Sequence, residues 1–147
     1  MRSVKKVERL QQVYNSLLKM REWEQRQSAD AVQEADSALC AINDSIQEAV
    51  VTSQGVRLTA QEVVMWNLYL GYLGTQHEAQ QSVLNERKET LEQRREDTIL
   101  AFQEKEKWRI QKDRLQAEIM KETSVREIKE ADELAIQKYA ETRQTEQ

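Results

Sequence analysis

Residues that could carry out catalysis are scarce in this sequence. His77 is the only histidine and Cys40 the only cysteine, so neither a two-histidine metal site nor an internal disulfide can form. A chain that folds back near Val56 would bring His77 within about one turn of Cys40, because it would lie opposite residue 35. A His–Cys nucleophile pair also needs an orienting group and a concave pocket. We therefore expect Cys40 to be a small residue packed between helices and His77 to lie on the surface.

The remaining polar residues show no pattern of a catalytic, metal or cofactor site. Glu62 stands three residues after Thr59, which is the spacing of a helix capping box rather than of an acid–base pair. No run of carboxylates has the spacing of a calcium loop, and no glycine-rich loop could bind a phosphate. Trp23, Trp66 and Trp108 could each anchor a partner or fill the space between helices. We expect no enzyme activity, no metal and no cofactor.

The composition favours long helices over a globular core. Charged residues make up 33% of the 147 residues and aromatic residues only 5%, proline is absent, and there are three glycines. Residues that lose little side-chain freedom in a helix dominate, as in coiled coils. Disorder is the main alternative, but apolar residues recur with a helical period and Pro- and Ser-rich tracts are missing. We predict one all-α coiled-coil domain over residues 1–147.

Charge and hydropathy limit the classes of partner. The net charge is −4, and the positive and negative side chains are mixed along residues 84–147, so no basic stripe suggests nucleic-acid binding. The longest uninterrupted apolar run, Val63–Trp66, is far shorter than the roughly 20 residues of a membrane helix. No secretory signal follows the basic start, and a single cysteine suits a reducing compartment. We expect a cytoplasmic chain without membrane insertion.

Two helices and a short turn follow from the apolar pattern. In the first half, heptad spacing extends over a set of positions: Val7, Leu10, Tyr14, Leu17, Ser28, Val32, Ala35, Leu39, Ile42, Ile46 and Ala49. Gly55 can end this helix, and the Thr59–Glu62 capping box with Leu58 and Val63 starts the next. We predict helix 1 at about 3–52, a turn at about 53–59, helix 2 at about 60–139 and a frayed tail at 140–147.

A short turn predicts a long antiparallel hairpin of two helices with unequal arms, the C-terminal helix being the longer. Folding back about Val56 predicts five contacts across the hairpin: Leu39 with Leu73, Ile42 with Leu70, Ala49 with Val63, Leu10 with Phe102, and Val4 with Trp108. Residues from about Ile110 onward have no internal partner, although they include Leu115, Ile119, Ile128 and Ile136. These side chains must be unpaired, or covered by a second copy or another protein.

Three stretches resemble the FliJ/YscO family in their order and spacing, and together they extend over nearly the whole chain. The stretches are as follows: Leu17–Glu24 (LLKMREWE); Thr59 to Glu62 with Trp66, Tyr69, Tyr72 and Leu73; and Lys129 with Asp132, Glu133, Leu134 and Ala135. The family consists of small cytoplasmic components of type III export systems, flagellar or injectisome, and the middle stretch is closer to the flagellar members.

The resemblance implies a protein like the central stalk of rotary ATPases, peripheral at the inner face of the bacterial cell membrane. Its expected partners are the hexameric export ATPase, the cytoplasmic ring of the export gate and export chaperones. The resemblance assigns gate contact to Trp66, Tyr69, Tyr72 and Leu73. It assigns ATPase contact to Lys129, Asp132, Glu133, Leu134 and Ala135, beside which we place Arg126. The alternative is a generic coiled-coil chaperone or scaffold unrelated to export.

Overall fold

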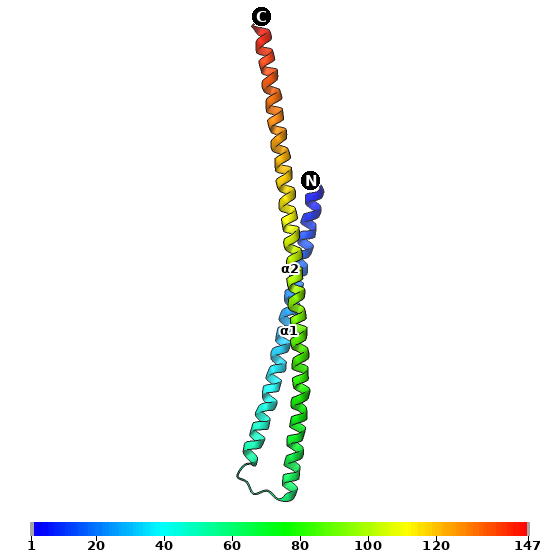
Figure 1. Cartoon of the computed structure of the whole chain (residues 1–147), viewed down its shortest axis with the longest axis vertical. Helices are drawn as coiled ribbons and strands as arrows, with labels where there is room; N and C mark the ends of the chain where they lie inside the picture. Colours follow the sequence, from blue (N-terminus) through cyan, green and yellow to red (C-terminus); the bar gives the residue numbers. More distant parts are fainter. Residues whose placement is uncertain (1, 147) are drawn as a thin grey trace. The chain divides into compact units, whose positions relative to one another are not determined.

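The computed structural model describes residues 2–146, and they form a hairpin of two antiparallel helices. Helix α1 spans Arg2–Ser53 and α2 spans Ala60–Thr145, so the C-terminal arm is the longer (Figure 1). No strand occurs within residues 2–146. The predicted all-α fold and the unequal arms are confirmed. The helices begin and end close to the predicted residues, except at the C-terminus.

The loop between the helices is formed by the local signals that predicted it. Gly55 has φ +79°, a left-handed conformation that glycine adopts without steric cost, and the Gln54 N–H donates to the Val51 carbonyl at 3.2 Å. The Glu62 N–H donates to Thr59 Oγ1 and the Thr59 N–H donates to Glu62 Oε2, both at 3.3 Å. These reciprocal bonds satisfy amides that the first turn of α2 leaves free. The predicted capping box is confirmed.

The C-terminal end of α2 differs from the prediction. We expected the helix to stop near Tyr139 and residues 140–147 to fray, but α2 continues to Thr145. The hydroxyls of Thr142 and Thr145 donate to carbonyls within the helix, and neither glycine nor proline occurs after Gly74. Nothing in the local sequence therefore ends the helix at Tyr139. Gln147 lies outside the described residues.

The hairpin divides into two compact units, of which one comprises residues 17–101. In this unit Ala35, Leu39 and Leu84 form a buried cluster, with Val32 packed against it. The fold-back prediction placed Leu73 opposite Leu39 and His77 opposite residue 35, and it is wrong. Ala35 lies against Leu84, which is seven residues, or one heptad, further along α2 than His77.

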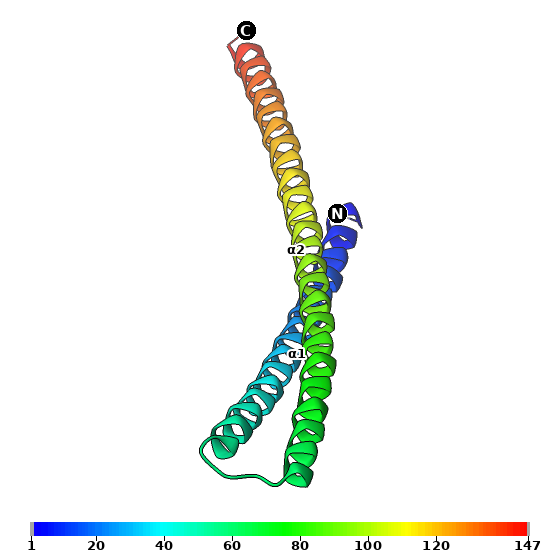
Figure 2. The same ribbon diagram turned by 60° about the horizontal axis from the view of Figure 1, so that its bottom comes forward.

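The register has a consequence at the loop. When α1 faces residues one heptad further along α2, the first turns of α2 extend past the end of α1, as both ribbon views show (Figures 1 and 2). Val63, Val64 and Met65 are accordingly exposed. The predicted contact between Ala49 and Val63 does not form for this reason, although Ala49 itself is buried.

The buried positions follow a 3–4 spacing that the sequence had located only in part. On α1 every predicted position from Val7 to Ala49 is buried or half-buried, and Leu18 is buried as well, beside half-buried Leu17. Cys40 is exposed beside buried Leu39. On α2, half-buried His77 falls between buried Leu73 and Leu84. The expectations for Cys40 and His77 are therefore both wrong. Leu39, which the apolar pattern had placed between the helices, is buried there, and its neighbour Cys40 is not.

The other unit comprises residues 1–16 and 102–147. Here Val7 is buried, and the Tyr14 and Trp108 rings stack with centroids 6.2 Å apart and an interplanar angle of 15°. Trp108 therefore contacts Tyr14 rather than the predicted Val4. Phe102, which we had placed opposite Leu10, is half exposed. Beyond this contact α2 continues past the start of α1, as Figure 1 shows.

Candidate partner-binding surfaces

The first candidate surface lies at the loop end of the unit of residues 17–101. Tyr69 and Tyr72 are exposed and Trp66 is half-buried, while Leu73 is only 7% exposed. The Trp66 and Tyr69 rings meet edge to face with centroids 6.0 Å apart. The first three side chains are accessible to a partner, whereas Leu73 packs within the hairpin. Three of the four residues assigned to gate contact therefore share an exposed region.

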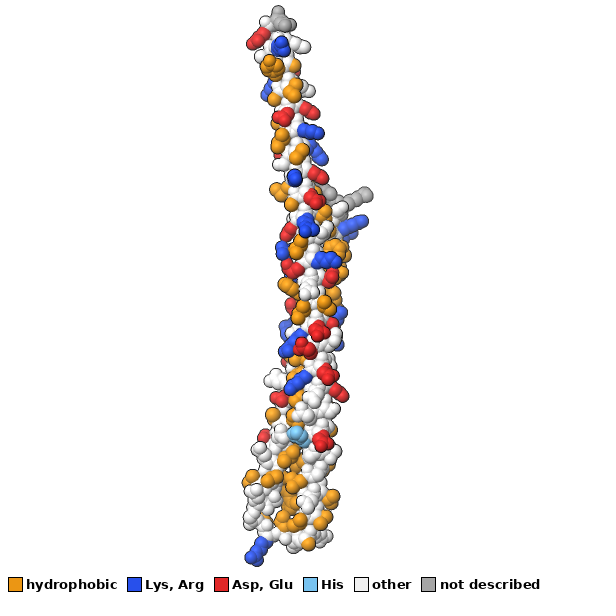
Figure 3. Space-filling model, viewed as in Figure 1, with side chains coloured by type: hydrophobic (Ala, Val, Ile, Leu, Met, Phe, Trp, Pro, Cys, Tyr) orange, Lys and Arg blue, Asp and Glu red, His pale blue; other side chains and the backbone are white. Residues whose placement is uncertain are grey.

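Sequence reasoning missed further members of this surface. Val64, Met65 and Leu68 are also exposed, the last at 70%. An open groove of about 420 Å³ is lined by Glu62, Met65, Trp66 and Tyr69. Around the loop end, hydrophobic and uncharged side chains predominate in the space-filling view (Figure 3). The absence of any charged residue between Val63 and Gln76 could have indicated the whole surface.

The second candidate surface is the C-terminal part of α2, in the unit of residues 1–16 and 102–147. The six residues assigned to ATPase contact are all exposed: Arg126, Lys129, Asp132, Glu133, Leu134 and Ala135. Ile128, Ile136 and Tyr139 are exposed too, each at more than 60%. A helix whose large apolar side chains are exposed to water lacks the packing that normally stabilises helices in proteins. The described residues provide no cover for them.

Helix geometry sorts these residues onto two faces. At about 100° per residue, Val125, Ile128 and Tyr139 fall on one side of α2. Arg126 and Glu133 fall on the other side, with Lys129 between the two faces. Asp132 lies on the apolar side, although it was predicted to make charged contacts. The segment therefore offers an apolar face bordered by charges of both signs.

Ion pairs along α2 keep its charged side chains fixed locally. Arg109 Nε lies 2.9 Å from Glu106 Oε2, and its Nη1 lies 3.1 Å from Asp113 Oδ2. The hydrogen bond to Glu106 raises the pKa of Arg109 above its ordinary value, and the charges of Glu106 and Asp113 add to this. A raised arginine pKa gives stability that is lost only at strongly alkaline pH, so this pair creates no pH dependence near neutrality.

Polar contacts also join the two helices, and the sequence pattern did not reveal them. Arg94 Nη1 lies 3.0 Å from Glu24 Oε2, and the Thr98 hydroxyl donates to the Arg21 carbonyl at 3.3 Å. The Gln80 amide donates to the Ala35 carbonyl at 3.1 Å. Long polar side chains at inward positions of the 3–4 spacing could have indicated these contacts. They interrupt an otherwise apolar interface in the middle of the chain.

Within residues 2–146 no cluster of His, Cys, Asp and Glu side chains has the arrangement of a metal site. In the same range, no helix combines the length and apolar character needed to cross a bilayer. Cys40 is exposed, and it lines neither the open groove beside Trp66 nor the one between Ala31 and Arg87. The described residues do expose large apolar side chains at the loop end and along the C-terminal part of α2.

Comparisons with protein-family models, with curated proteins and with solved structures gave no match for this chain.

Proposed function

We propose that this chain is a non-enzymatic component of a type III protein export apparatus, similar to a central stalk. It binds the hexameric export ATPase and couples it to the export gate and to export chaperones, in flagellum assembly or in type III secretion. The observation that carries the proposal is the exposed C-terminal part of α2. Its apolar residues, such as Ile128 and Tyr139, have no cover among the described residues, and its charged residues belong to the stretch that resembles FliJ/YscO proteins.

A partner that surrounds this helix explains its composition better than solvent does. A lone helix in water gains little from apolar side chains, since helix stability comes mainly from packing an apolar face. The bore of a hexameric ring would cover the apolar face through Val125, Ile128 and Tyr139 and contact Arg126, Lys129 and Glu133 at its wall. Leu134 and Ala135 complete the contact. The accessible aromatic residues at the loop end, Tyr69 and Tyr72, bind the gate ring.

The test is the rate of ATP hydrolysis by the export ATPase of the same cell, measured as phosphate release with and without this chain. We expect stimulation by the full chain and its loss after truncation at Lys121. The truncation retains the Tyr14–Trp108 stack and the ion pair between Lys112 and Glu8, so helicity per residue should be unchanged by circular dichroism. Full stimulation by the truncated chain would show that the ATPase-binding end is wrongly assigned.

A matched pair of point variants locates the contact more sharply. Ile128→Gln removes one apolar side chain from the exposed face, whereas Glu130→Gln changes the opposite face and keeps a good helix former. We expect Ile128→Gln to reduce stimulation more than Glu130→Gln does, because an anchor within a dry interface typically contributes more than 1 kcal/mol. Equal effects of the two variants would mean that the apolar face bearing Ile128 contributes no more to ATPase binding than the charged face does.

A chaperone or scaffold remains the competing function, and the same exposed side chains favour it. A scaffold would use Ile128 and Ile136 to hold clients or a second copy, without any effect on ATP hydrolysis. Analytical ultracentrifugation separates the two functions further. If the full chain forms a tight dimer that Ile128→Gln dissociates, and if it does not stimulate the ATPase, the scaffold function would be supported and the stalk function contradicted.

A further inference from the structure

Cationic residues that pair across the hairpin are repeated one heptad earlier on α2. Arg94 pairs with Glu24, and Arg87 stands seven residues before it; Lys112 Nζ lies 3.8 Å from Glu8 Oε1, and Lys105 stands seven residues before that lysine. Positions seven residues apart occupy equivalent places in a coiled coil. Glu24 and Glu8 therefore each have two cationic residues at equivalent places on α2.

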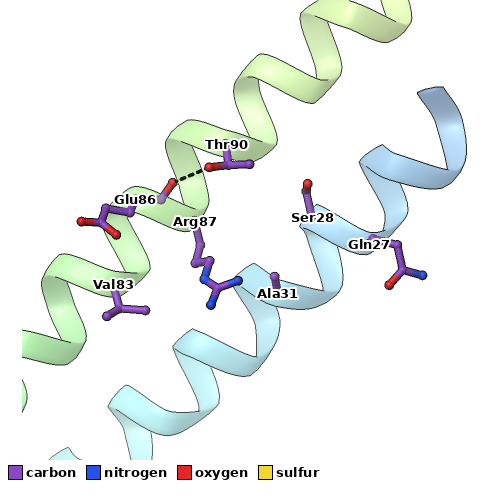
Figure 4. Close-up of a pocket in the computed structure, with 7 residues that line it drawn as sticks. All are labelled: Gln27, Ser28, Ala31, Val83, Glu86, Arg87 and Thr90. Carbon is purple, nitrogen blue, oxygen red and sulfur yellow. Dashed lines mark hydrogen bonds between the residues drawn. The ribbon is translucent and has the colours of Figure 1, made fainter. Parts of the chain in front are cut away.

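The earlier arginine already points to the same interface. Arg87 forms no ion pair within residues 2–146, and it extends toward α1 beside Ala31 in an open groove (Figure 4). The groove is lined on the α1 side by Gln27, Ser28 and Ala31. These short or flexible side chains leave room for an arginine to move along α1. One heptad of sliding brings Arg87 to the place of Arg94.

We propose that the hairpin has two stable registers, one heptad apart, and that α2 slides along α1 by about 10 Å between them. In the second register Glu24 pairs with Arg87 and Glu8 pairs with Lys105. The direction of sliding is determined by the charges. A slide the other way would place Ala101 opposite Glu24 and Ile119 opposite Glu8, and both pairs would be lost.

The loop favours the same direction. In the present register the first turns of α2 extend past the end of α1, so residues 54–59 must span this offset. Sliding into the second register shortens the overhang, whereas the opposite slide lengthens it. The loop and both ion pairs therefore permit one alternative register and disfavour the other.

Apolar contacts make the present register the more populated one in the free chain. Leu84, 3% exposed, packs with Ala35 and Leu39, and Trp108 stacks on Tyr14. The second register puts His77 in the place of Leu84 and Ala101 in the place of Trp108, which buries less apolar surface. It also moves Trp66 into the place of buried Leu73. A partner that binds one register more tightly shifts the populations of the two registers. The surface exposed at the loop end then changes as well.

Disulfide trapping tests the two registers, in a Cys40→Ser background that removes the native thiol. A disulfide needs Cα atoms within about 7 Å, so each cysteine pair reports one register. Ala35→Cys with Leu84→Cys reports the present register, and Ala35→Cys with His77→Cys reports the second. Ala35→Cys with Leu91→Cys reports the disfavoured slide and is the matched control. Intrachain linking in dilute protein with a glutathione redox buffer is followed by non-reducing electrophoresis, after circular dichroism shows equal helicity.

We expect the Leu84 pair to link fastest, the His77 pair more slowly, and the Leu91 pair not measurably. Arg94→Gln should speed linking of the His77 pair about two- to five-fold and Arg87→Gln should slow it by a similar factor, as expected for a partly exposed ion pair. Equal linking of the His77 and Leu91 pairs would mean fraying rather than a second register. The proposal is also overturned if Arg94→Gln and Arg87→Gln change linking of the His77 pair in the same direction.

Discussion

The Tyr14 ring stacks on the Trp108 indole across the hairpin, with 6.2 Å between ring centroids. Lys107 Nζ lies 5.9 Å from the centroid of the same indole. The Trp108 Nε1 atom is buried and has no hydrogen-bond partner, which costs free energy that the stacking must offset. The contact joins residues 94 positions apart in the chain and fixes how the start of α1 lies on α2.

The stack should be measurable as a coupling energy. A double-mutant cycle with Tyr14→Ala and Trp108→Ala, followed by urea unfolding, should give a coupling of about 0.5–1.5 kcal/mol, because aromatic pairs contribute this much beyond the area they bury. Trp66→Ala and Tyr69→Ala form the control cycle. That pair lies within one helix at i, i+3 and should give only about 0.2–0.5 kcal/mol. Equal couplings in the two cycles would contradict a specific role of the Tyr14–Trp108 stack.

Short sequence motifs predicted local structure well. They do not contain enough information to predict the register between the two helices. The Thr59–Glu62 capping box depends on four consecutive residues, and its hydrogen bonds form as predicted. The register depends on which heptad of α2 faces each heptad of α1, and an apolar repeat packs at several offsets. Polar contacts such as Glu24–Arg94 help to select among these offsets, and they could not be assigned before the offset was known.

The candidate surfaces also differ in how far they could be predicted without knowing the register. Tyr72 and Leu73 are neighbours in one family-like stretch, yet the first is 60% exposed and the second is buried. Only the position of α1 decides which of the two faces inward. For the C-terminal part of α2 the prediction was easier, since α1 is too short to reach it. Its exposure follows from the lengths of the two helices.

The capping box makes a second prediction about stability. Thr59→Ala removes the oxygen that accepts from the Glu62 N–H, and it should lower the free energy of unfolding by about 1 kcal/mol. Thr90→Ala is the matched control, because the Thr90 hydroxyl donates to the Glu86 carbonyl inside α2. Alanine is the better helix former there, so Thr90→Ala should be neutral or slightly stabilising. Urea midpoints compare the two, and an equal loss in both variants would argue against the cap.

Cys40 makes a third prediction. Because its side chain is exposed and outside the buried 3–4 positions, Cys40→Ser should change the free energy of unfolding by less than about 0.5 kcal/mol. Partner binding should be unchanged as well, measured with whichever partner is first shown to bind the full chain. A variant that keeps its stability but loses partner binding would instead indicate a functional thiol.

The three glycines make opposite predictions, which depend on backbone conformation alone. Gly71 and Gly74 lie within α2, and a Cβ atom at either position would meet nothing within 4 Å. Gly71→Ala and Gly74→Ala should therefore each raise the free energy of unfolding by about 0.5–1 kcal/mol, because alanine loses less backbone entropy in a helix. Space is also open at Gly55, but its φ of +79° is strained for alanine, so Gly55→Ala should lower stability by about 1 kcal/mol. Urea unfolding of the three variants distinguishes these effects. If Gly71→Ala or Gly74→Ala destabilises the chain, α2 is not a regular helix at that position in solution. The exposure of the neighbouring side chains Tyr69 and Tyr72 would then differ from that described above.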